Sequence, residues 1–140
     1  MTERVVIVGG GFDGLYAAQK LGGASSLEVT LVDRRNFHLF QPLLYQVATG
    51  GLSPGDIASP LRSVLKKYRN ISVLQAEVVG LHAAERRLEL VDGALQYDTL
   101  IIAAGSQPYY FGRDEWVEQA PGLKSIEDAL EMRRRILSAF

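Results

Sequence analysis

The most constraining feature of the sequence is a short apolar run that ends in a cluster of glycines. Residues 5–8 are all β-branched, and Gly9, Gly10 and Gly11 follow them directly. A run that is apolar at every position is typical of a strand covered on both faces, as in a parallel sheet. A helix should follow and end at Gly22-Gly23. Its buried side would consist of Leu15, Ala17, Ala18 and Leu21. The sequence therefore predicts a buried strand joined to a helix through a glycine hinge, residues 9–14.

The glycine hinge has the spacing Gly9-x-Gly11-x-x-Gly14. In dinucleotide-binding folds the first glycine allows a tight turn, and the second lets a pyrophosphate approach the backbone. The third lets the helix pack closely on the strand. The amides and the positive dipole end of the helix then face the phosphates. Because a purely structural turn could show the same triplet, the surrounding sequence has to decide between the two interpretations.

A second predicted strand favours the dinucleotide interpretation. Residues 28–32 look like a neighbouring strand, and Asp33 follows at its end. A carboxylate in this position can accept hydrogen bonds from the ribose hydroxyls of an adenosine. Arg34 and Arg35 come next, where arginines either reach an adenosine phosphate or form a solvated edge. Since the Asp33 carboxylate would repel a 2′-phosphate, the pattern indicates a nucleotide with a free 2′-hydroxyl.

Residues 37–52 are rich in apolar and aromatic side chains but show neither helical nor strand periodicity. We predict a loop here, and a loop with this content must cover something. It could cover a flat apolar ring system or pack into the protein core, and periodicity leaves both interpretations open. His38 has no second histidine or cysteine at metal-binding spacing, so a packed or hydrogen-bonded role is favoured for it.

Two Ser-Pro pairs predict helix starts in the next stretch. Ser53-Pro54 is followed by Asp56, an acid in the first turn. Ser59-Pro60 repeats the signal before an apolar spacing of three and four that indicates one buried helical face. The residues on that face are Leu61, Val64 and Leu65.

The second half of the chain predicts more strands. Residues 71–75 and 99–102 look like strands that would join the parallel sheet. A small antiparallel meander should lie between them, with a turn at Asp92-Gly93. Its strands would be residues 77–81, 87–91 and 94–97. The small residues after 102 would open into the same crevice as the glycine hinge, because parallel strands end at one edge.

The composition is consistent with one modest globular core and excludes several functions. The chain has 140 residues, of which 47% are hydrophobic and 22% charged, with a net charge of −1. This balance gives no sign of nucleic-acid binding. No run approaches the roughly 20 apolar residues of a bilayer span, and the first strand starts too early to leave room for a signal peptide. The sequence has no cysteine, which excludes disulfides and a redox-active cysteine pair within these residues. We expect no metal site and a cytoplasmic location.

These residues carry a family resemblance. The sequence resembles the N-terminal part of a type II NADH dehydrogenase, the single-subunit flavoprotein that passes electrons from NADH to quinone. The matching segments are residues 6–12, 33–36, 38–49, 52–54, 76–78, 97–98 and 110–112. The glycine hinge is common to many flavoproteins, whereas residues 38–49 are much more specific. The resemblance implies an α/β, Rossmann-like FAD/NAD(P)-binding fold with a central parallel sheet, flanking helices and the inserted meander, here truncated.

The resemblance also implies contacts to FAD. The hinge would surround the pyrophosphate, through Gly9, Gly10, Gly11, Phe12, Asp13 and Gly14. The adenosine ribose would be held by Asp33 and Arg34, and the adenine would meet the backbone of Val78. Pro42 and Leu43 would lie along the flavin, and the turn of Ala104 and Gly105 would approach FAD from the next strand.

Two of these positions depart from the family pattern. Asp13 replaces a small neutral residue, and a carboxylate beside a pyrophosphate would weaken binding. Ala104 replaces a common threonine, which removes one hydroxyl contact.

Members of this family are several hundred residues long. The resemblance therefore implies that residues 1–120 form the N-terminal part of an FAD-binding domain. Residues 121–140 would be a connecting helix towards an NADH-binding domain that is missing from the sequence. The whole protein would transfer hydride from NADH to FAD and then electrons to a quinone, and would touch the membrane peripherally through residues outside this chain. The last helix would leave an apolar stripe without an obvious partner, which favours self-association of the fragment or a missing cofactor. The stripe consists of Ile126, Ala129, Leu130, Ile136, Leu137 and Phe140.

Two other functions stay open. One is another FAD-dependent pyridine-nucleotide oxidoreductase, such as a sulfide:quinone or ferredoxin-type reductase. The other is a non-catalytic dinucleotide-binding module. No acid, base or nucleophile in the sequence is assigned a catalytic role, because a flavin supplies the reactivity itself.

Overall fold

The computed structural model describes residues 2–140. The chain forms two compact units. Unit 1 contains residues 2–38 and Ser59–Gly105, and unit 2 contains Leu39–Ala58 and Ser106–Phe140. The glycine hinge belongs to unit 1.

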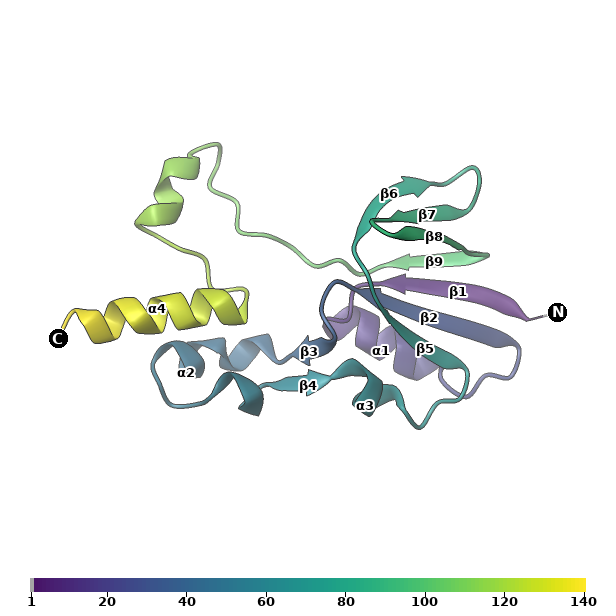
Figure 1. Cartoon of the computed structure of the whole chain (residues 1–140), viewed down its shortest axis with the longest axis horizontal. Helices are drawn as coiled ribbons and strands as arrows, with labels where there is room; N and C mark the ends of the chain where they lie inside the picture. The colour runs from purple at the N-terminus through teal and green to yellow at the C-terminus, as the bar shows by residue number, and fades with distance from the viewer. Residues whose placement is uncertain (1) are drawn as a thin grey trace. The chain divides into compact units, whose positions relative to one another are not determined.

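Unit 1 is built on a four-stranded sheet with the order β5-β2-β1-β9, in which all neighbouring strands are parallel (Figure 1). Its strands are β1 (Glu3–Val8), β2 (Leu27–Asp33), β5 (Ile71–Gln75) and β9 (Thr99–Ile102). Each lies within about two residues of a strand that the sequence predicts. The α/β fold class with a central parallel sheet is thereby confirmed.

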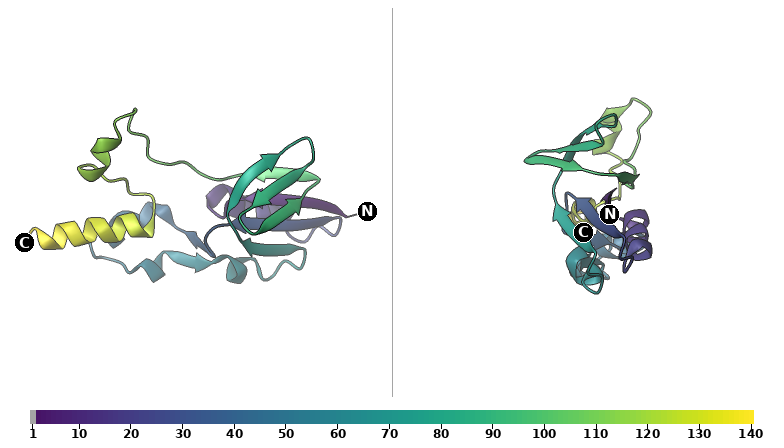
Figure 2. Two further views of the ribbon diagram at one scale, coloured as in Figure 1. Left: turned by 45° about the horizontal axis from the view of Figure 1, so that its top comes forward. Right: turned by 90° about the vertical axis from the view of Figure 1, so that its right-hand side faces the viewer.

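The alternating side chains of β1 supply two separate cores. Val5 and Ile7 belong to a core on one face of the sheet, and Val6 belongs to a core on the other. The first core also contains residues of two helices, Ala18, Leu61 and Leu65. The second contains Leu88 and Leu90 of the meander. Figure 2 shows the meander in front of the sheet and the first helix behind it. This double covering explains why residues 5–8 are apolar without alternation.

The helix after the hinge, α1 (Phe12–Leu21), ends at Gly22 as predicted. The side chain of Asn70 binds the end of this helix, a contact that no sequence pattern predicts. The Asn70 side-chain amide donates to the carbonyls of Leu21 and Ala24, at 3.1 and 3.2 Å, and its oxygen accepts from the Gly23 amide at 2.8 Å. Asn70 thereby satisfies carbonyls that a helix end leaves without partners.

The second helix of unit 1, α3 (Leu61–Leu65), buries Leu61 and Leu65 as the spacing predicts. The prediction that Ser59 caps this helix is wrong. Pro60 occupies the cap position without a side-chain hydrogen bond, and Ser59 lies in β4 (Ala58–Pro60), which pairs with β3 (Phe37–Leu39). Ser59 is part of a paired strand and therefore does not cap the helix, although the local sequence pattern is that of a cap.

The predicted meander is confirmed. Strands β6 (Val78–His82), β7 (Arg87–Leu90) and β8 (Gly93–Gln96) form an antiparallel sheet in that order. The β7–β8 connection contains Asp92, and Gly93 has a φ of +150°. The turn therefore needs glycine where the sequence predicts it.

The prediction of an irregular loop over residues 37–52 is wrong in part. The segment contains β3, a 3₁₀ turn η1 (Gln41–Leu43) and a short helix α2 (Leu44–Ala48). Leu44, Val47 and Ala48 are buried in a core of unit 2. The core-packing interpretation therefore holds for these three side chains. A five-residue helix is too short to show a helical period in sequence.

Unit 2 continues with the 3₁₀ turns η2 (Pro54–Asp56) and η3 (Asp114–Glu118) and the helix α4 (Ile126–Ser138). A capping box is present at Ser53, as the Ser-Pro pattern predicts, but it leads only to the single turn η2; a second capping box, at Ser125, starts α4. Ala129 of α4 is buried in the same core as α2.

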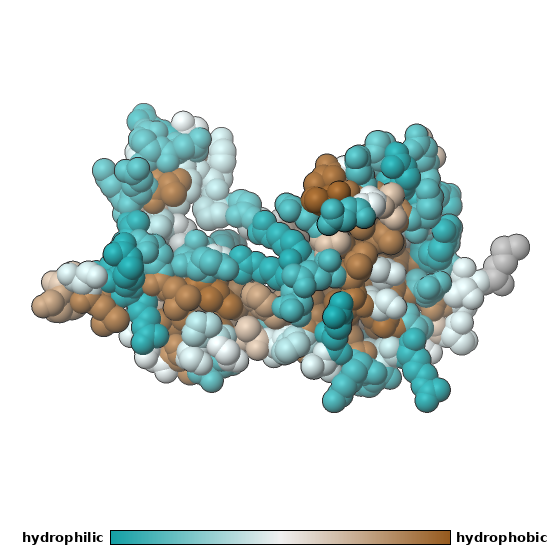
Figure 3. All heavy atoms as spheres, in the orientation of Figure 1, coloured by the Kyte–Doolittle hydropathy of each residue, from teal (hydrophilic) through white to brown (hydrophobic). Residues whose placement is uncertain are grey.

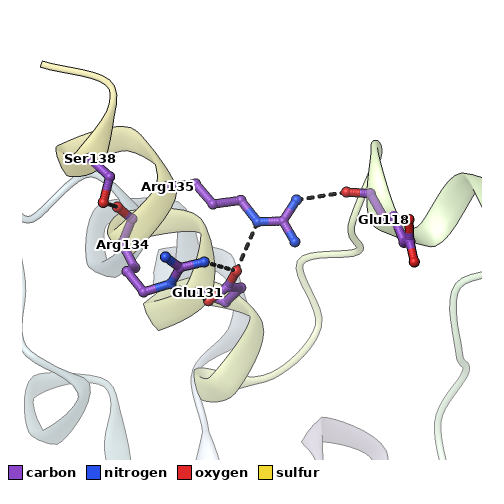
Figure 4. A network of polar contacts seen from close by, with 5 residues as sticks. All are labelled: Glu118, Glu131, Arg134, Arg135 and Ser138. Atoms are coloured by element: carbon purple, nitrogen blue, oxygen red, sulfur yellow. Dashed lines mark hydrogen bonds and ion pairs between the residues drawn. The ribbon is translucent and has the colours of Figure 1, made fainter.

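Figure 4 shows how α4 is fastened to η3. Glu131 accepts hydrogen bonds from Arg134 and Arg135, and Arg135 also donates to the Glu118 carbonyl at 2.7 Å. The hydrogen bonds from Arg134, and then from Arg135, lower the pKa of Glu131 to about 2.

Leu137 in the last turn of α4 and Phe140 beyond it are exposed apolar side chains. Figure 3 shows apolar surface at this end of the helix. The self-association expected from this stripe stays a prediction. Within residues 2–140, no helix is both long and apolar enough to cross a membrane.

Candidate dinucleotide-binding site

The glycine hinge lies where the carboxyl ends of three parallel strands meet. The Gly9 amide donates to the Val32 carbonyl at the end of β2, and the Ala103 amide donates to the Val8 carbonyl at the end of β1, both at 2.8 Å. The chain runs from β1 to β2 on one side, whereas β9 lies on the other side of β1. This reversal of direction is the place where open α/β sheets bind their ligands.

The packing of the protein's own backbone requires glycine at positions 9 and 14. Gly9 has a φ of +107°, and a Cβ there would overlap the Ala103 carbonyl oxygen. A Cβ on Gly14 would overlap the Gly9 carbonyl oxygen and press on Ile7. The two glycines thus allow the tight turn and the close packing of α1 on β1.

Gly10 is also enclosed by the protein. A Cβ on Gly10 would lie 2.6 Å from Cδ1 of Leu61 and 3.2 Å from Oδ2 of Asp33. Leu61 of α3 therefore packs against the hinge, a contact that no sequence pattern predicted.

Gly11 differs from the other hinge glycines because no contact within residues 2–140 requires a glycine at this position. Its φ of −70° is open to any residue, and a Cβ built on it meets no atom within 4 Å. The space beside it is the cradle that a bound pyrophosphate requires, since a side chain there would stand between the ligand and the backbone. The hinge therefore fits a dinucleotide on a geometric criterion.

The N-terminus of α1 supports the same conclusion. Gly11 is its N-cap residue and offers no side-chain hydrogen bond to the first turn. The backbone amides of a first turn have no partners within the helix, and the helix dipole places positive charge there. Asp13 is the acid of this turn and is exposed. Its charge opposes an anion at the hinge, which we expected from the sequence.

Asp33 points at the hinge, as the dinucleotide interpretation requires. Its Oδ2 accepts a hydrogen bond from the Gly10 amide at 2.6 Å, and its Oδ1 accepts from the Arg35 amide at 2.7 Å. Each carboxylate oxygen keeps a second lone pair for a ribose hydroxyl. Asp33 thus also anchors the hinge, a role that the spacing alone did not reveal. Arg34, next to it, is exposed.

His38 is hydrogen-bonded and packed, as predicted. Its Nδ1 lies 3.0 Å from the Gly10 carbonyl oxygen, and its ring meets the Phe12 ring edge-on with centroids 4.9 Å apart. Its place beside the hinge could not be read from periodicity. Among residues 2–140, no group of three or more potential metal ligands gathers.

The other predicted contacts lie in different places. Ala104 follows β9 and its amide comes near Gly9, while Gly105 comes next with a φ of +75°. Val78 is the first residue of β6 and packs at the edge of the second core. Pro42 and Leu43 belong to η1 in unit 2, and their approach to a flavin remains a prediction.

Arg4 and Asp98 align β9 with β1 and so help to place Ala104. Asp98 accepts hydrogen bonds from the Arg4 amide at 2.8 Å and from its guanidinium at 3.0 and 3.1 Å, and the Asp98 amide donates to the Arg4 carbonyl at 2.9 Å. The side-chain hydrogen bond from Arg4 lowers the pKa of Asp98 to about 2.

This lowered pKa predicts a pH dependence. A carboxyl group whose pKa is lower in the folded than in the unfolded state stabilises the fold above the unfolded pKa, near 4. That stabilisation is lost as the pH falls through about 2. We expect Asp98→Asn to lower the thermal midpoint by a few degrees at pH 7, and we expect the difference from wild type to shrink between pH 4 and pH 2. The pKa of Glu131 is lowered to a similar value, and its contribution to the thermal midpoint cancels when the variant is compared with wild type at each pH. A difference that is constant across this range would contradict the prediction.

Comparison with known proteins gives consistent results. The sequence profile described as pyridine nucleotide-disulphide oxidoreductase matches residues 3–138. A type II NADH:quinone oxidoreductase of Mycobacterium tuberculosis is 54% identical over 142 residues, which cover 99% of this chain and 30% of that protein.

Solved structures have the same fold. The NDH2 of Plasmodium falciparum, determined in complex with NADH, has a TM-score of 0.86 and 29% identity, covering 99% of this chain and 29% of that one. The sulfide:quinone oxidoreductase of Aquifex aeolicus has a TM-score of 0.87 and 27% identity, covering 98% of this chain and 32% of that one.

The chain spans 30% of the length of the mycobacterial relative. The resemblance to type II NADH dehydrogenases, first indicated by short motifs, is confirmed by 54% identity along nearly the whole sequence. Since the family profile also covers almost every residue, this chain belongs to the pyridine nucleotide-disulphide oxidoreductase family.

Proposed function

We propose that this chain is the FAD-binding part of a type II NADH:quinone oxidoreductase. The observation that carries the proposal is the cradle at Gly11, which lies beside the first turn of α1 and within the hinge that Asp33 anchors. Backbone atoms of the protein exclude a side chain at Gly9 and at Gly14, and Leu61 packs on Gly10, whereas the space beside Gly11 is left for a ligand. The identity to a mycobacterial enzyme of this name supports the choice of reaction.

The proposed contacts follow the cofactor from its phosphates outwards. The hinge amides bind the pyrophosphate, Asp33 and Arg34 hold the adenosine ribose, and the backbone of Val78 meets the adenine. Pro42 and Leu43 lie along the flavin, and Ala104 and Gly105 approach FAD from the end of β9. FAD bound there would accept hydride from NADH and deliver electrons to a quinone. The residues of this chain bind and orient the cofactor, and none of them needs to act as an acid or base.

The domain organisation of the whole protein is part of the proposal. Residues 1–120 contribute to the FAD-binding domain, and residues 121–140 lead towards an NADH-binding domain. Residues outside this chain supply the contact with the cytoplasmic face of the membrane.

The first test is whether the purified chain binds FAD. We expect flavin absorbance bands in the protein after incubation with excess FAD and gel filtration, and chromatography of the released cofactor should identify FAD. A preference for FMN, or no retained flavin, would refute the assignment of the site. The Gly11→Val variant serves as the control for flavin bound elsewhere on the protein.

A second function is kept because the sulfide:quinone oxidoreductase of Aquifex aeolicus matches the fold equally well. The two reactions differ in the electron donor. The whole protein should reduce a quinone with NADH, and it should not do so with sulfide. The reverse result would leave the FAD site in place but replace the reaction.

Asp13 offers a prediction in which affinity and stability change in opposite directions. Asp13→Asn removes a negative charge next to the proposed pyrophosphate, and we expect FAD to bind roughly threefold to tenfold more tightly. The same change removes an acid that favours the helix N-terminus, so the free energy of unfolding should fall by about 0.5 kcal/mol.

Titration of FAD fluorescence and urea unfolding measure the two effects. Asp92→Asn removes the same charge at the exposed β7–β8 turn and is the matched control, for which affinity should not change. Unchanged affinity in Asp13→Asn would mean that the Asp13 carboxylate points away from the phosphates.

A further inference from the structure

The two peptide groups of Gly10 are each held by a side chain. The Gly10 amide donates to Oδ2 of Asp33 at 2.6 Å, and the Gly10 carbonyl oxygen lies 3.0 Å from Nδ1 of His38. A carbonyl oxygen can only accept a hydrogen bond, so Nδ1 of His38 carries the proton and donates it. Asp33 therefore fixes the peptide before Gly10, and His38 fixes the peptide after it.

Fixing the Gly10 carbonyl also fixes the amide of Gly11. The trans peptide group is planar, so its N–H and its C=O point in opposite directions. Because the Gly10 carbonyl is turned towards His38, the Gly11 N–H is turned away from His38. Gly11 is the N-cap residue of α1 and has no side chain that could hinder rotation of this peptide. Without the bond from His38, two consecutive glycines would leave the peptide free to turn.

The histidine is itself held in place. Its ring meets the Phe12 ring edge-on, with an interplanar angle of 86° and centroids 4.9 Å apart. Such an arrangement is favourable for aromatic rings. His38 is half-buried at the middle of β3. Phe12, one residue beyond Gly11, thus keeps the imidazole beside the hinge.

We infer that His38 is a positioning residue that sets the Gly11 N–H towards the cofactor pyrophosphate before the cofactor binds. The inference rests on the proposed function, because it concerns the same site. Donors that are oriented in advance bind an anion more tightly, since their ordering costs nothing at the moment of binding. His38 thus acts through the backbone, without touching the phosphates itself.

Two substitutions separate the hydrogen bond from the ring contact. His38→Phe keeps an aromatic ring against Phe12 but removes the donor, and we expect FAD affinity to fall about tenfold. His38→Asn loses the ring, but its amide nitrogen can take the place of Nδ1, and we expect affinity within about threefold of wild type. Fluorescence titration gives the affinities, and thermal unfolding checks that both variants are folded. Equal affinity of His38→Phe and wild type would overturn the inference. So would a loss in His38→Asn as large as in His38→Phe.

An experiment without cofactor distinguishes this inference from the proposed function. In the ligand-free protein at pH 8, ¹⁵N NMR of the imidazole should show the tautomer with the proton on Nδ1, and the Gly11 amide signal should shift in His38→Phe but much less in His38→Asn. The other tautomer, or an unmoved Gly11 signal, would refute the role of His38 whether or not FAD binds. If these signals appear as expected but wild type retains no FAD, the proposed function fails. The orientation of the Gly10–Gly11 peptide by His38 would still hold.

Discussion

Replacing Gly11 by valine is expected to abolish FAD binding while leaving the fold almost intact. A Cβ at this position meets no protein atom within 4 Å apart from its chain neighbours, and the backbone angles there are allowed for valine. It would, however, occupy the space that the pyrophosphate needs. The loss of two charge-assisted hydrogen bonds from the hinge amides corresponds to an affinity reduced by at least roughly a hundredfold. The free energy of unfolding should fall by no more than about 1 kcal/mol, because valine is a poorer N-cap residue than glycine.

Gly14→Ala is the matched control. It is expected mainly to lower the stability of the fold, whereas Gly11→Val is expected mainly to lower the affinity for FAD. Alanine in a helix is favoured over glycine by about 1 kcal/mol. Here its Cβ would overlap the Gly9 carbonyl oxygen, so α1 must move away from β1. We expect a net loss of roughly 2 kcal/mol of unfolding free energy in urea titrations. A Gly11→Val protein that is as destabilised as Gly14→Ala, or that still retains FAD, would show that the cradle at Gly11 has been misinterpreted.

Asp33→Ala is expected to damage both the fold and the site. The substitution removes the acceptors of the Gly10 and Arg35 amides, and hydrogen bonds to a charged group contribute about 1.5 to 3 kcal/mol each. Since both amides are only partly buried and water can replace the carboxylate in part, we expect a loss of about 2 to 4 kcal/mol in unfolding free energy. FAD affinity should fall by roughly a hundredfold or more, because the ribose loses its acceptor and the hinge loses its anchor.

Arg34→Ala provides the comparison for this second prediction. The Arg34 side chain is exposed, and its carbonyl bond to Gln75 does not depend on the side chain. We expect FAD affinity to fall modestly and the unfolding free energy to stay within about 0.5 kcal/mol of wild type. If Asp33→Ala kept wild-type stability in urea, the anchoring role assigned to its carboxylate would be wrong, even if FAD binding were lost.

The sheet was predictable because a strand covered on both faces must be apolar at nearly every position. The predicted runs of β1 and β9 have this property, whereas those of β2 and β5 mix apolar with polar residues; all four boundaries lie within about two residues of the prediction. The meander was predictable for a different reason. Its turn needs a residue with positive φ, and Gly93 supplies it.

What could not be predicted depends on contacts between distant residues. Ser59 has the local pattern of a helix cap, but its backbone is used by β4. Helix α2 has five residues, fewer than two turns, so its apolar side chains show no period.

At the site, the spacing indicated that Asp33 belongs near the hinge. Only the fold shows that Asp33 binds the Gly10 amide, that Leu61 packs on Gly10 and that His38 faces the Gly10 carbonyl. Such pairings arise from the tertiary arrangement, and a single sequence carries no record of them.

The two-sided packing of β1 has a consequence for how this segment can vary over evolutionary time. Val5 and Ile7 serve one core and Val6 the other, so deleting or inserting a single residue before Gly9 would exchange the two sets of side chains. The same change would move the hinge by one step relative to Asp33. Substitutions among aliphatic residues are therefore tolerable in this strand, whereas insertions and deletions are not. The distance along the chain from the first buried valine to the first glycine should be invariant among homologues, even where the residues themselves differ.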